Sequence, residues 1–219
     1  MNNVHYFCFC SKVISSVMGV SERKAREKEE LRSLILNGAM ALFAEKGVEN
    51  VTIRNIAEAI EYSVGTVYVY FKDKNAILHA LHTEGFLQLG SLFQTLAQVT
   101  DPMERLRASG RLYLQFAVAN PDMYDLMFNM KAPLDFVEDC AEEEWNEGKS
   151  AFNFLLHVVE DCLMAGFFKG HRAKPLAFMI WSTVHGMCHL AIARRTDVVG
   201  LEKPVEEGFA EFLMLLDRV

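Results

Sequence analysis

Residues 51–75 of the chain read Val-Thr-Ile-Arg-Asn-Ile-Ala-Glu-Ala-Ile-Glu-Tyr-Ser-Val-Gly-Thr-Val-Tyr-Val-Tyr-Phe-Lys-Asp-Lys-Asn. This stretch predicts two short helices that are joined by a tight turn. Thr52 is a suitable N-cap for the first helix, because its hydroxyl can accept a hydrogen bond from an unpaired amide of the first turn. Ser63 can cap the second helix, which covers 64–71 and is followed by a basic segment. The apolar side chains of the first helix share one face at helical spacing: Ile53, Ile56, Ala57 and Ile60.

Two short helices with such a turn are the pattern of a helix-turn-helix motif. In that motif the second helix lies in the major groove of DNA, and the first helix braces it across the backbone. The second helix and the segment after it carry polar side chains suited to phosphates and base edges: Ser63, Thr66, Tyr68, Tyr70, Lys72 and Lys74. These residues predict a contact with duplex DNA.

A longer pattern surrounds the motif. Residues 63–74 read Ser-x-Gly-Thr-x-Tyr-x-Tyr-Phe-Lys-x-Lys, and Thr-x-x-x-Ile-Ala precedes them by one helix. Upstream, 31–47 predicts a helix that ends in Phe-Ala-Glu-Lys-Gly. Its inner face carries Ile35, Ala39, Leu42 and Phe43. Together these segments resemble the DNA-binding signature of the TetR (tetracycline-repressor-type) family of transcriptional regulators.

The resemblance implies roles for individual residues. In the family, the residues that match Thr52 and Arg54 contact phosphate at the start of the first short helix. The residue that matches Tyr68 is a phosphate-contacting tyrosine, and the one that matches Lys74 grips the DNA backbone from the next helix. The DNA-binding residues implied in this way are Thr52, Arg54, Ser63, Val64, Gly65, Thr66, Tyr68, Val69, Tyr70 and Lys74. Two of them, Val64 and Val69, stand where longer polar or aromatic residues are frequent, and both could contact a thymine methyl group.

The charge of the chain is divided unevenly. The 219 residues carry a net charge of −7, but residues 1–80 hold ten Lys/Arg and nine Asp/Glu, whereas residues 81–219 hold twelve and twenty. A near-neutral first part and an acidic second part fit a small, specific duplex contact better than general coating of nucleic acid. The composition, 51% hydrophobic and 23% charged, is that of an ordinary globular protein.

The five cysteines disfavour a disulfide framework, because they are odd in number and widely spaced, and they favour a reducing compartment. They are Cys8, Cys10, Cys140, Cys162 and Cys188. Cys162 and Cys188 lie in apolar helical segments and are expected to be buried as small hydrophobic residues. Redox sensing is the alternative interpretation.

Two patterns could indicate a metal site. His185 and His189 are four residues apart, a spacing that lets two imidazoles share a metal. His157-x-x-Glu160 has the opposite order to the Glu-x-x-His motif of di-iron bundles and no second copy. The acidic run 142–144 is interpreted as a solvated helix face. Since the sequence also has no nucleophile–base constellation and no phosphate-binding loop, we expect no metal, no cofactor and no catalysis.

Helical patterns follow one another along the chain, and β-strand patterns are nearly absent. The expected helices are 22–46, the two short helices, 76–99 with Asn75 as its cap, 102–120 after Asp101, 122–130, 134–168 with a bend near Gly148, 176–195 and 204–217. The predicted fold class is therefore all-α. An N-terminal three-helix DNA-binding domain with the helix-turn-helix covers 21–80, called the head below. A C-terminal helical domain for effector binding and dimerisation covers 81–219, called the body.

Residues 1–20 are expected to be a disordered leader or an over-extended gene start, because the segment after Met18 has the charged character of a natural beginning. Neither a basic n-region nor a cleavage site marks a signal peptide. No apolar run is expected to be long enough to span a bilayer. These observations predict a cytoplasmic protein.

The body is rich in Phe and Met, which line adaptable ligand pockets inside helical bundles but can also simply form a core. The candidate walls of an effector cavity are Phe116, Tyr124, Phe128, Phe152, Trp181 and His185. Trp181 and His185 share a helix face, and with Gly186 they resemble the Trp/His/Gly-bearing helix in the C-terminal domain of one branch of the family. His185 is either a hydrogen-bonded core residue or a donor to an effector, and Gly186 would allow close approach of a neighbouring helix.

The last two helices are apolar enough to pair with a second copy of the chain. The residues expected on their pairing faces are Ile180, Val184, Leu190, Ile192, Phe209, Phe212, Leu213 and Leu216. Helix-turn-helix proteins commonly bind two half-sites as dimers. By the resemblance, these helices form a four-helix interface in the homodimer.

The sequence thus predicts a homodimeric transcriptional regulator, a repressor that binds a palindromic DNA operator and is released by a small apolar effector. A ligand-independent architectural DNA-binding protein is an alternative within the same class. An all-α metal-bundle enzyme is the alternative from a different class.

Overall fold

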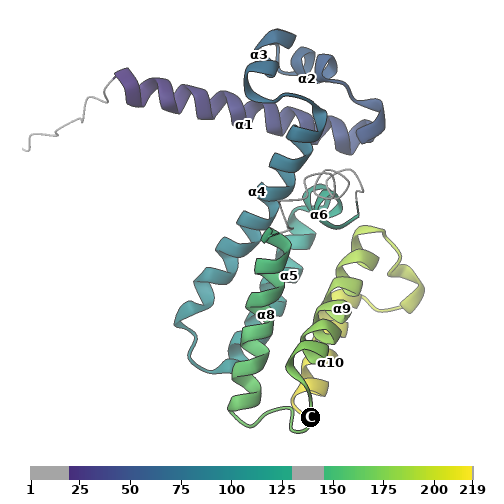
Figure 1. The fold of residues 1–219 in the computed structure, drawn as a ribbon. Coiled ribbons are helices and arrows are strands. Elements are labelled where there is room, and N and C mark those ends of the chain that lie inside the picture. Colours follow the sequence, from purple (N-terminus) through teal and green to yellow (C-terminus); the bar gives the residue numbers. More distant parts are fainter. Residues whose placement is uncertain (1–19, 130–145, 219) are drawn as a thin grey trace, which may run out of the picture.

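The computed structural model describes residues 20–129 and 146–218, and all their regular structure is helical. The predicted leader and the first part of the predicted helix 134–168 lie outside these residues. Figure 1 shows the head at one end of the molecule and the body below it, with one long helix running from one to the other. The predicted all-α fold class is confirmed.

The head is built from α1 (Val20–Lys46), α2 (Ile53–Ala59), α3 (Val64–Tyr70) and the beginning of α4 (Lys74–Gln94). A short 3-10 segment, Val48–Asn50, connects α1 to α2. The predicted caps of both short helices are present. The Thr52 hydroxyl accepts from the Asn55 amide at 3.2 Å, the Asn55 side chain accepts from the Thr52 amide at 2.9 Å, and Ser63 Oγ accepts from the Thr66 amide at 3.1 Å.

The start of α4 differs from the prediction. Asp73, not Asn75, is the N-cap, and its carboxylate accepts from the Ala76 amide at 2.7 Å. A carboxylate caps as well as an amide does and also suits the positive end of the helix dipole. The earlier cap places Lys74 and Asn75 inside the first turn.

The turn between α2 and α3 contains a non-glycine residue in the left-handed region. Glu61 has φ 59°, and the Tyr62 amide donates to the Ala57 carbonyl at 2.9 Å. This backbone closure is typical of a helix end at which glycine is the usual residue. The turn therefore holds a local strain in order to set the angle between the two helices.

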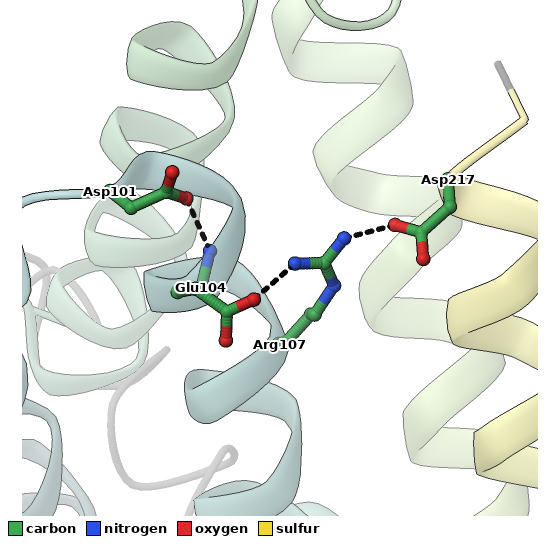
Figure 2. A network of polar contacts seen from close by, with 4 residues as sticks. All are labelled: Asp101, Glu104, Arg107 and Asp217. Carbon is green, nitrogen blue, oxygen red and sulfur yellow. Dashed lines mark hydrogen bonds and ion pairs between the residues drawn. The ribbon is translucent and has the colours of Figure 1, made fainter.

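The body contains α5 (Pro102–Ala119), α6 (Pro121–Phe128), α8 (Asn146–Met164), α9 (Ala173–Ile192) and α10 (Pro204–Leu216) around the rest of α4. Short 3-10 segments lie at Thr95–Gln98 and Asp197–Val199. Figure 2 shows how α5 is tied to the end of α10. The Arg107 guanidinium donates to Glu104 in its own helix and to Asp217 just after α10, while the Asp101 cap accepts from the Glu104 amide at 2.8 Å.

The apolar cores of head and body are distinct clusters of buried side chains. Two residues of the head cluster come from the body: Leu81 of α4, at the boundary, and Leu126 of α6, which is fully buried there. The whole head cluster consists of Ile35, Leu36, Ala39, Leu42, Phe43, Val51, Ile53, Ile56, Ala57, Ile60, Val67, Phe71, Ile77, Leu78, Leu81 and Leu126. Head and body are therefore packed together through α6 as well as continuous through α4.

Helix α9 corrects the expectation about membrane spans. By length and composition alone it could cross a bilayer, and 28% of its most apolar window is buried inside the chain. No charged residue interrupts the apolar run of this helix between Lys174, in its first turn, and Arg194, just after its end. The helix packs against α5, α8 and α10, so it is part of the body's bundle.

The predicted pairing faces of α9 and α10 are also wrong in part. Four of the residues assigned to them are buried within the single chain: Ile180, Val184, Phe209 and Leu216. The large apolar side chains that these helices expose are Leu190, which was among the predicted residues, and Phe178, Met179, Met214 and Leu215, which were not. Because both sides of these helices are apolar, their periodicity does not reveal which side is turned inward.

At Gly38, α1 closely approaches the end of α2, and replacing this glycine by alanine tests the packing. A Cβ atom there would lie 2.5 Å from Cγ2 of Ile60, whereas one on Gly90 of α4 would meet nothing within 4 Å. Overpacking costs about 1–3 kcal/mol and alanine regains up to about 1 kcal/mol of helix propensity. We expect Gly38→Ala to lower the free energy of unfolding by roughly 1 kcal/mol in denaturant titrations, and Gly90→Ala to raise it by about 0.5–1 kcal/mol. Equal stabilisation by both would contradict the packing described.

Candidate nucleic-acid interface and effector cavity

Helix α3 presents one face to solvent. Gly65, Tyr68 and Val69 are spaced three and four residues apart and are exposed. The exposed fraction is 53% for Tyr68 and 76% for Val69. At the start of α2, Thr52 and Arg54 are exposed as well. The outer face thus offers a phenol hydroxyl, an isopropyl group and a glycine that allows close approach.

The opposite face of α3 packs on the head. Val67 is fully buried, and Val64 and Tyr70 are half-buried against the head cluster. Both were among the residues that the resemblance implied as DNA-binding, and the structure turns them toward the core. Ser63 and Thr66 lie beside each other with their hydroxyl oxygens 2.8 Å apart.

Lys74 has a structural contact at this surface. Its ammonium donates to the Val48 carbonyl at 2.8 Å, which ties the start of α4 to the 3-10 segment after α1. An ammonium has three donors. One hydrogen bond inside the head therefore leaves two donors for a phosphate oxygen.

The body contains a cavity of about 1020 Å³ that is lined by residues of α4, α5, α6, α8, α9 and α10. Its walls are mainly aliphatic and aromatic. Of the predicted wall residues, Phe128, Phe152 and Trp181 line it. The other three do not: Phe116 and Tyr124 are buried in the body core, and His185 is hydrogen-bonded to Tyr113, which does line the cavity.

Two features of the cavity were not recognised from the sequence. Tyr113 of α5 lines it, although its place in an amphipathic helix gave no sign of that role. Arg172 and Lys174, at the beginning of α9, also line it. A signal for these two existed in the sequence, because they belong to a basic segment within an otherwise acidic body.

Four polar side chains form a hydrogen-bonded cluster at the cavity wall: Tyr113 and Tyr124, which are buried, and Trp181 and His185, which are half-buried. Nδ1 of His185 lies 2.9 Å from the Tyr113 hydroxyl and 2.5 Å from the Tyr124 hydroxyl. The indole N–H of Trp181 donates to the Tyr113 hydroxyl oxygen at 3.3 Å. The cluster connects α5, α6 and α9 and brings Trp181 and Tyr113, which line the cavity, into contact with Tyr124 of α6.

Protonation states follow from burial. Desolvation, with a smaller contribution from His189, lowers the pKa of His185 below its usual 6.5. Burial raises the pKa of the Tyr113 and Tyr124 hydroxyls, so both keep their protons. A neutral imidazole accepts one hydrogen bond at Nδ1. One tyrosine therefore donates to His185, and the other hydroxyl must find its acceptor within the cluster.

The two described cysteines are buried and unpaired, as the sequence predicted. Desolvation raises the pKa of Cys162 to about 11 and that of Cys188 to about 12. Both remain thiols at neutral pH, which weighs against thiolate-based redox sensing. Among the described residues, no group of three or more His, Cys, Asp or Glu is placed to share a metal ion.

Comparisons with known families agree with this architecture. The family model described as "Bacterial regulatory proteins, tetR family" matches residues 35–81, and the model described as "Tetracyclin repressor-like, C-terminal domain" matches residues 106–216. Fold and site define a helix-turn-helix transcriptional regulator with a helical second domain. The chain belongs to the TetR family.

Individual relatives are consistent with this assignment. The chain is 28% identical over 191 residues to the HTH-type transcriptional regulator HbdR of Aromatoleum sp. (strain CIB), covering 82% of this chain and 78% of that protein. It is 25% identical over 155 residues to the probable acrEF/envCD operon repressor of Escherichia coli (strain K12), covering 67% and 69%. These relatives are regulators, and the chain is a DNA-binding transcription regulator and not an enzyme.

Solved structures share the fold. A protein of unknown function from Rhodococcus sp. RHA1 superposes with a TM-score of 0.69 at 22% identity, over 86% of this chain and 94% of that one. The TetR family regulator PfmR from Thermus thermophilus superposes with a TM-score of 0.63 at 19% identity, over 84% and 97%.

The polar cluster predicts a pH-dependent stability that His185 controls. Because folding lowers the pKa of His185 below 6.5, the unfolded chain takes up a proton that the folded chain resists. Stability should be fully present above about pH 6.5 and fall as the pH drops below it. His185→Phe should cost about 1–3 kcal/mol at pH 7.5, because it strands tyrosine hydroxyls. It should also flatten the acid side of the stability profile in thermal unfolding.

His157 supplies a matched control, because it is an exposed histidine on α8. His157→Gln should keep the wild-type stability and pH profile. A His185→Phe protein as stable as wild type, with the same loss of stability below pH 6.5, would contradict the described role of the imidazole.

Proposed function

We propose that the chain is a repressor that binds a palindromic operator as a homodimer and leaves it when a small, largely apolar effector fills the body. The head (21–80) acts as the DNA-binding domain and the body (81–219) as the effector-binding and dimerisation domain, in the cytoplasm. The observation that carries the proposal is that the exposed face of α3 and the cavity of about 1020 Å³ are connected through one short helix, α6.

Operator contact is assigned to the outer face of α3 and the start of α2. Tyr68 and Thr52 would donate to phosphates with Arg54 and Lys74, and Val69 and Gly65 would approach base edges. Ser63 caps α3, and Thr66, whose amide donates to Ser63 Oγ, stands in the first turn, so both lie at the N-terminal end of the helix. Val64 and Tyr70 are left to position the helix, because they pack on the head.

Homodimerisation is assigned to α9 and α10. The large apolar side chains exposed on these helices would be covered by the same helices of a second copy. A Cβ on Gly186 would meet nothing within 4 Å in the single chain, so a partner helix could approach α9 closely at this point. A two-fold pair of heads matches two half-sites of a palindrome.

Effector release is assigned to the position of α6. The helix has Leu126 in the head core and Tyr124 in the polar cluster at the cavity wall, and Phe128 at its end lines the cavity. A ligand that displaces Trp181 or Tyr113 changes the hydrogen bonds of Tyr124, and α6 carries that change to the head. The ligand shifts the equilibrium only by the difference in its affinity for the two arrangements. The cavity favours this mechanism over a ligand-independent architectural role.

The operator contact predicts the behaviour of two substitutions. Tyr68→Phe and Lys74→Ala should each weaken binding to operator and random duplexes by similar factors, roughly fivefold for Tyr68→Phe, because phosphate contacts carry no sequence information. Lys74→Ala should also make the slope of log K against log salt shallower by about 1. Fluorescence anisotropy across a salt series measures both effects.

Lys169→Ala is the control, since this exposed lysine lies in the connection between α8 and α9, outside the head. It should leave both affinity and slope unchanged. Thermal unfolding of Lys74→Ala separates loss of the Val48 hydrogen bond from loss of a phosphate contact. An unchanged salt slope in Lys74→Ala would exclude the phosphate assignment.

The dimer surface predicts a change in oligomeric state. The pair Met179→Glu and Leu215→Glu places charges on residues that are 51% and 60% exposed in the single chain. If a partner covers them, the double variant should sediment as a folded monomer and lose most operator affinity. Leu87→Glu on α4, which is 61% exposed, is the control and should remain dimeric. A dimeric double variant would place the interface elsewhere.

A further inference from the structure

The cavity has an asymmetry that its overall apolar character hides. The loop between α8 and α9 and the first turn of α9, residues 165–175, contain Lys169, His171, Arg172 and Lys174 but no Asp or Glu. Two of these cations, Arg172 and Lys174, line the cavity. No Asp or Glu is among the described residues that line it.

The two lining cations have no partner inside the described part of the chain. Neither the Arg172 nor the Lys174 side chain forms a hydrogen bond or ion pair with another described residue. The nearby carboxylate of Asp161, at the end of α8, is occupied by Arg105 at 2.8 Å. Lys149 also lines the cavity, but from the beginning of α8. Because α8 and α9 pack side by side through a short connection, Lys149 belongs to the opposite end.

From the cationic end, an aromatic wall leads inward. Phe178, one turn after Lys174, has its ring 6.3 Å from that of Trp181. The ring centroid of Trp181 also lies 6.1 Å from that of Phe152 in α8 and 6.5 Å from that of Phe128 in α6. All four rings line the cavity. One end therefore carries two exposed cations, which are unpaired among the described residues, and the wall next to it is aromatic, while Lys149 lies at the opposite end.

We propose that the effector of this regulator is an amphipathic anion, with an apolar chain or ring system in the cavity and a carboxylate or phosphate group held by Arg172 and Lys174. The inference rests on the proposed function and narrows its effector to one chemical class. A cation would meet like charge at this end, and a neutral apolar molecule would leave both side chains without a partner. Because Arg172 and Lys174 are exposed to water, screening limits the free energy of each ion pair with the effector. The two residues would therefore favour anions over neutral molecules by a moderate factor.

The test uses three probes that share a twelve-carbon chain: sodium dodecanoate, dodecan-1-ol and dodecylamine, each below its micelle concentration. Affinities are measured by calorimetry at pH 7.5 on the full-length protein. Dodecanoate should bind about three- to tenfold more tightly than dodecanol, the range for two solvent-exposed charge contacts, and dodecylamine most weakly. Dodecyl phosphate, measured in parallel, distinguishes a carboxylate from a phosphate head group.

Substitutions at the basic end of the cavity test where the carboxylate of the probe binds. Arg172→Gln combined with Lys174→Gln should remove the preference for dodecanoate over dodecanol while leaving dodecanol affinity unchanged. Lys169→Gln is the matched control, because it lies in the same basic segment but does not line the cavity, and it should keep the preference. Both changes are on exposed side chains, so unfolding temperatures should match wild type.

Chain length separates binding in the cavity from a surface contact. Each methylene withdrawn from water contributes about a fourfold change in affinity, so dodecanoate, decanoate and octanoate should weaken in that order. Equal affinity for all three would show that an anion on the surface is all that is bound, and would overturn the inference.

The measurements distinguish a failure of the anionic-effector inference from a failure of the proposed function. Equal binding of dodecanol and dodecanoate, unaffected by the double variant, would overturn the anionic class but leave an apolar effector in place. If no probe binds, the inference fails, and the operator-binding assay run on the same preparation shows whether the DNA-binding function still stands.

Discussion

Helix α6 belongs to two hydrophobic clusters at once, and this double burial constrains the rest of the molecule. Its eight residues place Leu126 in the head core and Tyr124 in the body core, and both side chains are fully buried. On the neighbouring helix, a Cβ at Gly85 would lie 2.6 Å from the Met127 sulfur, so α4 and α6 are in close contact. Since cores are densely packed, the head cannot change its angle to the body unless α6 repacks. The orientation of the recognition helix is therefore a property of the body as much as of the head.

The polar cluster around His185 restricts the packing of α6 to an arrangement in which its hydrogen bonds can form. An apolar core tolerates many arrangements of similar energy, whereas buried hydroxyls and an imidazole are satisfied in few. Tyr113, Tyr124 and His185 come from three helices, and they share hydrogen bonds with a tryptophan of the cavity wall. The arrangement of α5, α6 and α9 is thereby coupled to whatever touches Trp181. A histidine that the sequence presented as a possible ligand contact serves, in the structure, as the acceptor that holds α6 in place.

Local patterns were sufficient to predict the helices and their caps, and they failed where tertiary packing decides the outcome. Thr52, Ser63 and Asp101 cap their helices as predicted, because capping depends on a few consecutive residues. The misplaced cap at Asn75 arose because two good capping residues lie close together. By contrast, the outward turn of Met179 and Leu215 and the inward turn of Ile180 and Leu216 depend on neighbouring helices. The cavity walls are hardest to predict, since they depend on which side chains of several helices leave a space between them. For that reason Tyr113 was missed and Phe116 was included.

The outer face of α3 and the cavity lie in different parts of the molecule, and this separation limits how one can affect the other. The outer face of α3 and the cavity share no side chain, so any influence of one on the other must be carried by α4 and α6 as a difference in packing energy. Coupling free energies between such sites are typically about 1–3 kcal/mol, which is comparable to burying or exposing one large apolar side chain. The free energy of burying the Leu126 side chain alone is of this magnitude. Under the proposed function linkage is reciprocal, so an effector that weakens operator binding by a given factor would itself bind more weakly, by the same factor, to the operator-bound protein. In the proposed mechanism, the packing of α6, which helps to fix the angle of the head, would therefore also limit how strongly an effector could change that angle.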